Sequence, residues 1–177
     1  IQFDLEYFNK ITKGGLPNKT LNIALAGTGV GKSLFMCHHA SSVLLEGKNV
    51  LYITLEMAEE KIAERIDANL LNVAIQDITD LPKPMFDKKV NSIAKKTQGT
   101  LIIKEYPTAS AHSGHFKSLL NELALKKSFR PDIIFIDYLN ICASSRYRAA
   151  SNVNSYSYIK AIAEAVSYTH LTLPTRS

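Results

Sequence analysis

The chain has 177 residues, of which 46% are hydrophobic and 21% charged, a composition typical of one globular domain with a buried core. No apolar run approaches the roughly 18 residues of a membrane span and no signal peptide is recognisable, so the sequence excludes a membrane protein and favours the cytoplasm. The net charge of +5 suits polyanionic ligands, ATP and nucleic acid among them. Cys37 and Cys142 lack the spacing of metal ligands, and we expect both to be reduced and buried.

The first apolar run leads into a glycine-rich segment. Residues Leu21–Leu25 predict a strand, and residues Lys32–Glu46 have a helical pattern that Gly47 ends. Between them lies the segment Ala26-Gly27-Thr28-Gly29-Val30-Gly31-Lys32-Ser33. A strand, a glycine-rich loop and a helix start are the setting of a phosphate-binding P-loop. The backbone N–H groups of such a loop point at phosphate oxygens, and the positive end of the helix dipole strengthens that field.

The motif assigns a role to individual residues. Ala26 replaces the first glycine of the pattern, at a position that needs a small residue more than a flexible one. Lys32 is expected to reach the β- and γ-phosphates, and the Ser33 hydroxyl to bind Mg²⁺. A glycine-rich turn with a chance Gly-Lys-Ser is the alternative, and the flanking strand and helix disfavour it. The expected cofactors are therefore ATP and Mg²⁺.

Strand-like and helical patterns alternate along the rest of the chain, which predicts parallel βαβ units and an α/β fold. Leu81-Pro82-Lys83-Pro84 is interpreted as a linker. Further strands are predicted at 50–55, 101–103 and 133–137. One helix is predicted from the apolar stripe of Ile62, Ile66, Leu70 and Val73. Three more are predicted in the polar stretch that ends near Lys96, from Phe116 to Leu123, and from about Tyr156.

Two acidic residues end predicted strands and complete the expected site. Asp137 follows a four-residue apolar run, which is the Walker B arrangement, and is expected to hold the hydration shell of Mg²⁺. An ordinary aspartate at a strand end is the alternative. Glu56 ends the strand after the P-loop helix and is expected to polarise the attacking water as the general base. Its alternative is a helix N-terminal acid that acts on the dipole together with Glu59 and Glu60.

The residues after these strands carry a family resemblance. Leu55-Glu56-Met57 and Asp137-Tyr138-Leu139, together with Tyr106-Pro107-Thr108 before a helix, resemble the RecA-like ATPase core of DnaB-type replicative helicases. Over roughly residues 3–165 the chain closely resembles the T-even bacteriophage members of that family. The resemblance implies a RecA-like P-loop NTPase with a mostly parallel sheet flanked by helices. It also implies that Lys32 and Ser33 bind phosphate and Mg²⁺, with Glu56 as base and Asp137 as the Walker B acid.

The resemblance further implies a DNA-facing loop after Walker B. Arg146 and Arg148 would meet single-strand phosphates and Tyr147 would stack on a base, whereas a solvated basic loop is the alternative. Arg65 matches a family arginine position, with a surface salt bridge as the alternative. His112 and His115 form an H-x-x-H pattern at a helix start, which we interpret as plain loop histidines because no third ligand is nearby.

As a member of such a family, the chain is expected to act in a homo-oligomeric ring, a hexamer, on single-stranded DNA, with a primase and a helicase loader as partners. A RecA-type recombinase and a nucleotide-gated scaffold are the alternative functions. Residues 1–166 are expected to form a partial ATPase core, and residues 167–177 a non-native tail. Because the arginine finger and the second DNA loop of the family would lie beyond Ala165, the isolated chain is expected to hydrolyse ATP slowly.

Overall fold

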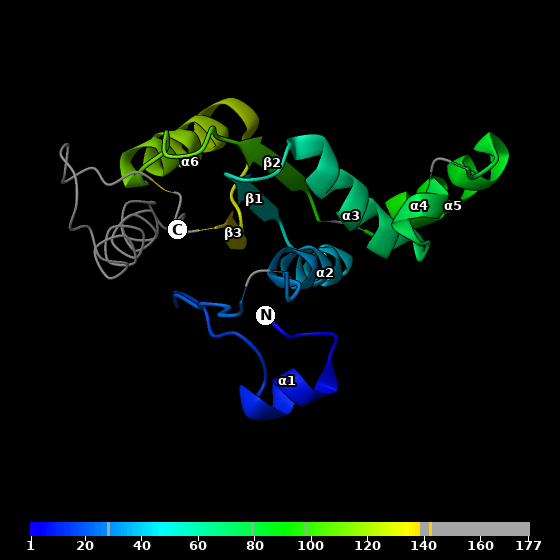
Figure 1. Cartoon of the computed structure of the whole chain (residues 1–177), viewed down its shortest axis with the longest axis horizontal. Helices are drawn as coiled ribbons and strands as arrows, with labels where there is room; N and C mark the ends of the chain where they lie inside the picture. The colour runs from blue at the N-terminus through cyan, green and yellow to red at the C-terminus, as the bar shows by residue number, and fades with distance from the viewer. Residues whose placement is uncertain (28, 79, 98, 139–141, 143–177) are drawn as a thin grey trace, which may run out of the picture.

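A parallel sheet forms the centre of the computed structural model, which describes residues 1–27, 29–78, 80–97, 99–138 and 142. The 3-stranded sheet has the order β2-β1-β3, with β1 at Val50–Thr54, β2 at Leu101–Glu105 and β3 at Ile133–Asp137. β1 pairs in parallel with both neighbours, and Thr54 lies opposite Glu105 on one side and Asp137 on the other. The carboxyl ends of the three strands therefore meet at one edge of the sheet (Figure 1).

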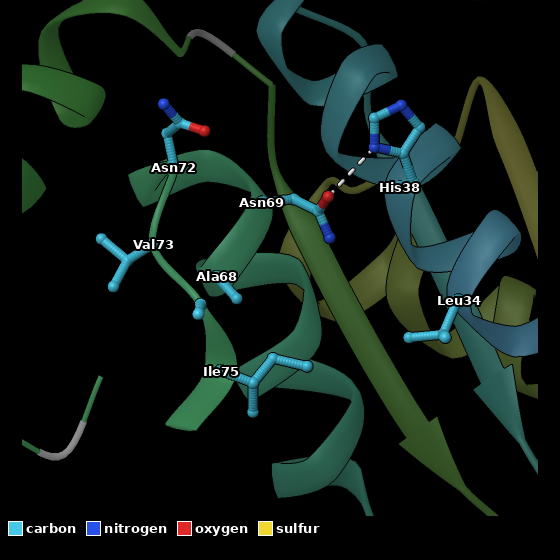
Figure 2. Close-up of a pocket in the computed structure, with 8 residues that line it drawn as sticks. Leu34, His38, Ala68, Asn69, Asn72, Val73 and Ile75 are labelled. Atoms are coloured by element: carbon cyan, nitrogen blue, oxygen red, sulfur yellow. Dashed lines mark hydrogen bonds between the residues drawn. The ribbon is translucent and has the colours of Figure 1, made fainter. Parts of the chain in front are cut away.

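Helices cover both faces of this sheet. α2 (Lys32–Leu45) and α3 (Glu59–Leu71) lie on one face, and α6 (Ser113–Lys127) lies on the other (Figure 1). α2 and α3 are packed side by side and joined by a hydrogen bond between His38 Nδ1 and Asn69 Oδ1 at 3.0 Å (Figure 2). This sandwich of a parallel sheet between helices confirms the predicted α/β class.

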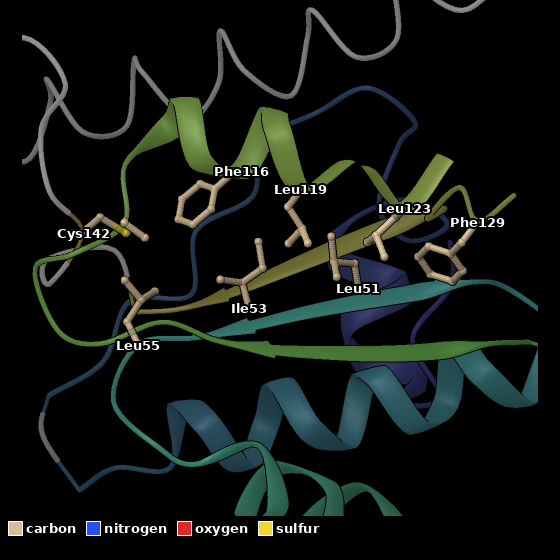
Figure 3. Close-up of a cluster of buried hydrophobic side chains, with 9 residues drawn as sticks. Leu51, Ile53, Leu55, Phe116, Leu119, Leu123, Phe129 and Cys142 are labelled. Atoms are coloured by element: carbon tan, nitrogen blue, oxygen red, sulfur yellow. The ribbon is translucent and has the colours of Figure 1, made fainter. Parts of the chain in front are cut away.

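The side chains of β1 alternate between the two faces, and both faces are buried. Leu51 and Ile53 pack against Phe116 and Leu119 of α6 (Figure 3). Val50 and Tyr52 point the opposite way, into a cluster with residues of α2 and α3 such as Val43, Ile62 and Ile66. Burial on both faces explains why the sequence of β1 is a continuous apolar run rather than an alternating one.

Most predicted elements are confirmed, and the differences have local causes. α3 ends at Leu71 because Asn72 takes the left-handed conformation with φ 52°, so Val73 lies beyond the helix. α5 (Lys83–Lys96) begins inside the predicted linker, since proline is compatible with the first turn of a helix. The short helices α1 (Glu6–Ile11) and α4 (Ile75–Ile78) are not among the predicted elements. The helix expected from Tyr156 lies outside the described residues.

The strand predicted at Leu21–Leu25 is absent from the described residues, so this prediction is wrong for the structure. Leu21 is 45% exposed, Ile23 57% and Leu25 94%, which is far from the buried environment of β1. The described sheet ends at β3, and residues 21–25 are exposed and do not pair with it. A parallel strand is stable when both of its faces are covered, and that cover is missing here. No helix among the described residues is long and apolar enough to cross a membrane.

Candidate nucleotide-binding site

The glycine-rich segment turns directly into α2. Gly29 has φ 75° and Gly31, the N-cap of α2, has φ 106°, which are left-handed values that favour glycine. No side chain of the described residues caps this end of the helix, so its first N–H groups are available to an anion. Thr28, the remaining loop position of the motif, lies outside the described residues. The local backbone is therefore suited to binding phosphate.

Lys32 is held over the loop that precedes it. Its ammonium donates to the carbonyl oxygen of Ala26 at 2.8 Å and to that of Gly27 at 2.9 Å. Ser33 follows in the first turn of α2 and is half-buried. The cation and the hydroxyl predicted to bind phosphate and Mg²⁺ thus lie at the same helix end as the available N–H groups.

Asp137 lies at the carboxyl end of β3 and is 2% exposed. It faces a cleft of about 660 Å³ that Lys32 also lines, so the structure brings the predicted P-loop lysine and the predicted Walker B acid to one cavity. The same cleft separates β3 from the unpaired segment 21–25. Other residues at the loop end of the cleft are Ala26, Val30, Gly31 and Tyr138.

Glu56 follows β1 at the same edge of the sheet, but it is exposed and is not among the residues that line this cleft. The backbone around it is fixed by hydrogen bonds. Thr54 Oγ1 donates to the Met57 carbonyl at 2.7 Å and accepts the Met57 N–H at 3.1 Å. Leu55 N–H donates to the Asp137 carbonyl at 2.8 Å, which ties this turn to β3.

Thr108 adds a further contact to the turn, because its hydroxyl donates to the Leu55 carbonyl at 3.0 Å. Sequence reasoning missed the roles of Thr54 and Thr108 in holding the turn. For Thr54 the sequence signal was a hydroxyl residue two positions before Glu56, since such residues often hydrogen-bond to the backbone of a turn. For Thr108 the only signal was its place in a family-like Tyr-Pro-Thr, since the contact to Leu55 spans distant parts of the chain.

Tyr52 is the polar group that sequence reasoning treated only as a strand residue. It is 0% exposed, and its hydroxyl donates to Asp137 Oδ2 at 3.1 Å. Burial is the main cause that raises the pKa of Tyr52, so the phenol stays protonated and acts as a donor. Cys37 on α2 donates its S–H to the same hydroxyl at 3.8 Å, and burial also raises the pKa of this thiol. Both Cys37 and Cys142 are free and buried, which confirms that expectation.

Among the described histidines, His39 lines the cleft but is packed against aromatic rings, and the others do not line it. His112 accepts the Gly114 N–H at the start of α6, and His115 accepts the His112 N–H, so both lie at the predicted helix start. They cap the helix, and His115 belongs to α6, so the interpretation as plain loop residues is wrong. His39 is 2% exposed and stacks on Phe3, and burial lowers its pKa to about 4. His38 contacts Asp4 at 2.6 Å and borders a separate hollow of about 500 Å³ between α2 and the end of α3 (Figure 2).

Some predicted positions remain without a structural test. Arg146, Tyr147 and Arg148 lie outside the described residues. Arg65 lies on α3, half-buried, and its carbonyl accepts the side-chain N–H of Asn69 at 2.7 Å. Among the described residues, no group of at least three His, Cys, Asp or Glu side chains is arranged to hold a metal ion by itself.

Comparisons with known proteins agree with the resemblance. The family model of the DnaB-like helicase C terminal domain matches residues 1–171. The DnaB-like replicative helicase of Enterobacteria phage T4 is 52% identical over 167 residues, which are 93% of this chain and 35% of that protein. A probable plasmid replicative DNA helicase of Chlamydia psittaci is 30% identical over 130 residues, covering 70% of this chain and 27% of that protein.

Solved structures show the same fold. A solved ATPase domain matches with a TM-score of 0.61 at 17% identity, over 80% of this chain and 51% of that one. A DnaB-like replicative helicase, studied with its interactions with primase, matches with a TM-score of 0.57 at 16% identity, over 80% of this chain and 34% of that one. This chain spans about a third of the length of its T4 relative. With a glycine-rich loop and a strand-end aspartate on one cleft and a family match over nearly its whole length, the chain belongs to the DnaB-like helicase C-terminal domain family.

Proposed function

We propose that this chain is the ATPase motor domain of a replicative DNA helicase, which couples ATP hydrolysis to movement along single-stranded DNA and to duplex unwinding. The observation that carries the proposal is the shared cleft of Lys32 and Asp137 in a member of the DnaB-like family. The proposed ATPase core comprises residues 1–166, and residues 167–177 are proposed to be a non-native tail.

The residues present suit a nucleotide with a divalent cation. The uncapped N–H groups of α2 and the Lys32 ammonium suit the phosphates, because both are donors at a helix N-terminus. The Ser33 hydroxyl and the Asp137 carboxylate are the hard oxygen ligands that Mg²⁺ prefers, and they would hold it. When bound, Mg²⁺ supplies charge that stabilises the transferring phosphoryl group.

Glu56 is proposed as the general base. Its turn is fixed to β3 through Leu55, while its exposed side chain extends beyond the sheet edge. It would take the proton of the attacking water as the bond from the γ-phosphorus to ADP breaks. Because Glu56 does not line the cleft of Lys32 and Asp137, this role requires its side chain to turn toward the γ-phosphate when nucleotide binds.

The DNA and protein partners in this proposal rest on the names of the relatives and on the family resemblance. The T4 relative is a replicative helicase, and a structural relative was studied with its interactions with primase. We therefore include single-stranded DNA, a primase, a helicase loader and a hexameric ring in the proposal, with Arg146 and Arg148 as DNA contacts. A recombinase or a scaffold is not part of the proposal, because the T4 and Chlamydia psittaci relatives are both named as helicases.

The direct test is the ATPase rate of the full-length protein with and without single-stranded DNA. We expect hydrolysis that DNA stimulates, together with unwinding of a forked duplex. Lys32→Ala serves as the control and should abolish both signals. An ATPase that ignores single-stranded DNA, or a protein that binds no ATP, would contradict the proposed function.

A further inference from the structure

A buried chain of hydrogen bonds joins α2, β1 and β3 behind the P-loop. Cys37 and Tyr52 are each 0% exposed, and Asp137 is 2% exposed. The thiol of Cys37 donates to the Tyr52 oxygen, and the Tyr52 hydroxyl donates to Asp137 Oδ2. A phenol has a single proton, so the donor from Cys37 directs that proton toward the carboxylate.

The register of the sheet explains why these groups meet. Tyr52 lies opposite Phe135, two residues before Asp137, and its ring stacks on that of Phe135 with centroids 5.7 Å apart. Because side chains alternate along a strand, Tyr52, Phe135 and Asp137 share the face that α2 covers. The long tyrosine side chain therefore reaches the carboxylate from the neighbouring strand.

We propose that Tyr52 is a positioning residue for Asp137: its hydroxyl fixes the carboxylate in the orientation that binds the Mg²⁺–nucleotide complex, and Cys37 orients the hydroxyl. This rests on the proposed function, because it adds a residue to the same Mg²⁺ site. With Oδ2 held by the phenol, Oδ1 is the oxygen left for a ligand from the cleft that Asp137 lines. Phenylalanine would pack on Phe135 without the cost of burying a hydroxyl, so the polar atom has a use beyond packing.

Tyr52→Phe in the full-length protein tests the role, because it removes only the hydroxyl. The probe is a non-hydrolysable ATP analogue, whose binding is followed by calorimetry while Mg²⁺ is titrated. We expect the Mg²⁺ concentration at half-saturation to rise about tenfold, the effect of losing one hydrogen bond to a charged group. Binding of the analogue in excess chelator should not change, because the loop N–H groups and Lys32 do not contact Tyr52.

Two controls separate positioning from packing. Tyr106→Phe removes the hydroxyl from a half-buried tyrosine whose ring contacts Phe116 of α6. This variant should keep the wild-type Mg²⁺ dependence. Val43→Ala removes apolar volume from the same buried cluster, so it should lower the unfolding temperature and leave the Mg²⁺ dependence unchanged. Should Tyr52→Phe fail to fold, Cys37→Ala keeps the phenol and is expected to raise the Mg²⁺ requirement about two- to threefold.

If Tyr52→Phe folds and keeps the wild-type Mg²⁺ dependence, the positioning role is overturned. If Tyr52→Phe does not fold, a wild-type Mg²⁺ dependence of Cys37→Ala overturns it. Lys32→Ala in the same assay shows which proposal has failed. If Lys32→Ala loses the analogue with and without Mg²⁺, the nucleotide site stands and only the role of Tyr52 is lost. If Lys32→Ala binds the analogue like the wild type, the proposed function itself is wrong.

Discussion

The sheet edge around Asp137 and the loop that ends at Lys32 face the same cleft but are held by different means. At the edge, contacts between residues distant in sequence fix the chain, as when Tyr52 holds Asp137 and Thr108 holds Leu55. In the loop, the hydrogen bonds of Lys32 within the described part of the chain go to carbonyls five and six residues away, and the preceding segment pairs with no described strand.

The difference suggests a division of labour. Long-range pairing fixes the backbone that carries the carboxylates, whereas the glycine-rich loop depends on local backbone conformation at Gly29 and Gly31. Changes at the edge should therefore alter turnover or Mg²⁺ dependence, and changes in the loop should alter nucleotide affinity. Substitutions on each side of the cleft test that division.

Glu56→Gln is expected to have the largest effect. It should lower kcat by roughly 10² to 10⁴, the usual contribution of a general base, while ATP affinity stays within about twofold. Steady-state ATPase assays and calorimetry on the full-length protein measure the two quantities. Glu60→Gln is the matched control, since Glu60 is an exposed acid in the first turn of α3. Equal effects of the two changes would make Glu56 a helix-dipole acid rather than a base.

Lys32→Ala tests whether the glycine-rich loop determines ATP affinity. Losing charge-assisted contacts to the phosphates should weaken ATP binding by about 100-fold, as measured by calorimetry. Lys48→Ala removes an exposed lysine beyond the other end of α2 and should bind ATP like the wild type. Unchanged affinity in Lys32→Ala would remove the P-loop assignment.

Thr54→Val keeps the shape of a fully buried side chain and removes both of its bonds to Met57. We expect the free energy of unfolding to fall by about 1–3 kcal/mol, because the Met57 N–H and carbonyl lose their partner. The turn that carries Glu56 should loosen, so kcat should drop more than ATP affinity. Thr108→Val breaks a single bond and should show the same pattern more weakly. A drop in affinity alone would argue against a separate role for the edge.

Gly31→Ala is expected to have the smallest effect. The residue has φ 106°, so a β-carbon there should cost about 1 kcal/mol of stability and weaken ATP binding modestly. Gly27→Ala is the matched control, because Gly27 lacks a left-handed φ and its added β-carbon would meet only Val30 Cγ2 at 3.6 Å. Urea unfolding compares the two. If both variants lose the same stability, backbone conformation is not what selects glycine at position 31.

Elements with strong local patterns are predicted correctly from the sequence alone. The strand predicted at Ile133–Asp137 begins and ends at the same residues as β3. The helix predicted at Lys32–Glu46 is one residue longer than the observed α2, which ends at Leu45. Such elements are predictable because burial on both sides of a strand leaves a continuous apolar run, and burial on one side of a helix leaves apolar residues at helical spacing. The segment Leu21–Leu25 is also an apolar run but does not form a strand, because a strand also needs an adjacent strand to pair with.

Local sequence determined the position of the glycine-rich loop before α2, the acids at the strand ends and the α/β class, because each depends on residues that are close along the chain. Tertiary structure alone decided that Lys32 and Asp137 line one cleft while Glu56 does not. It also decided that Tyr52 on one strand would hold Asp137 on the next, across a gap of 85 residues. The register of a parallel sheet sets such contacts, and register depends on how distant segments pack rather than on either segment by itself.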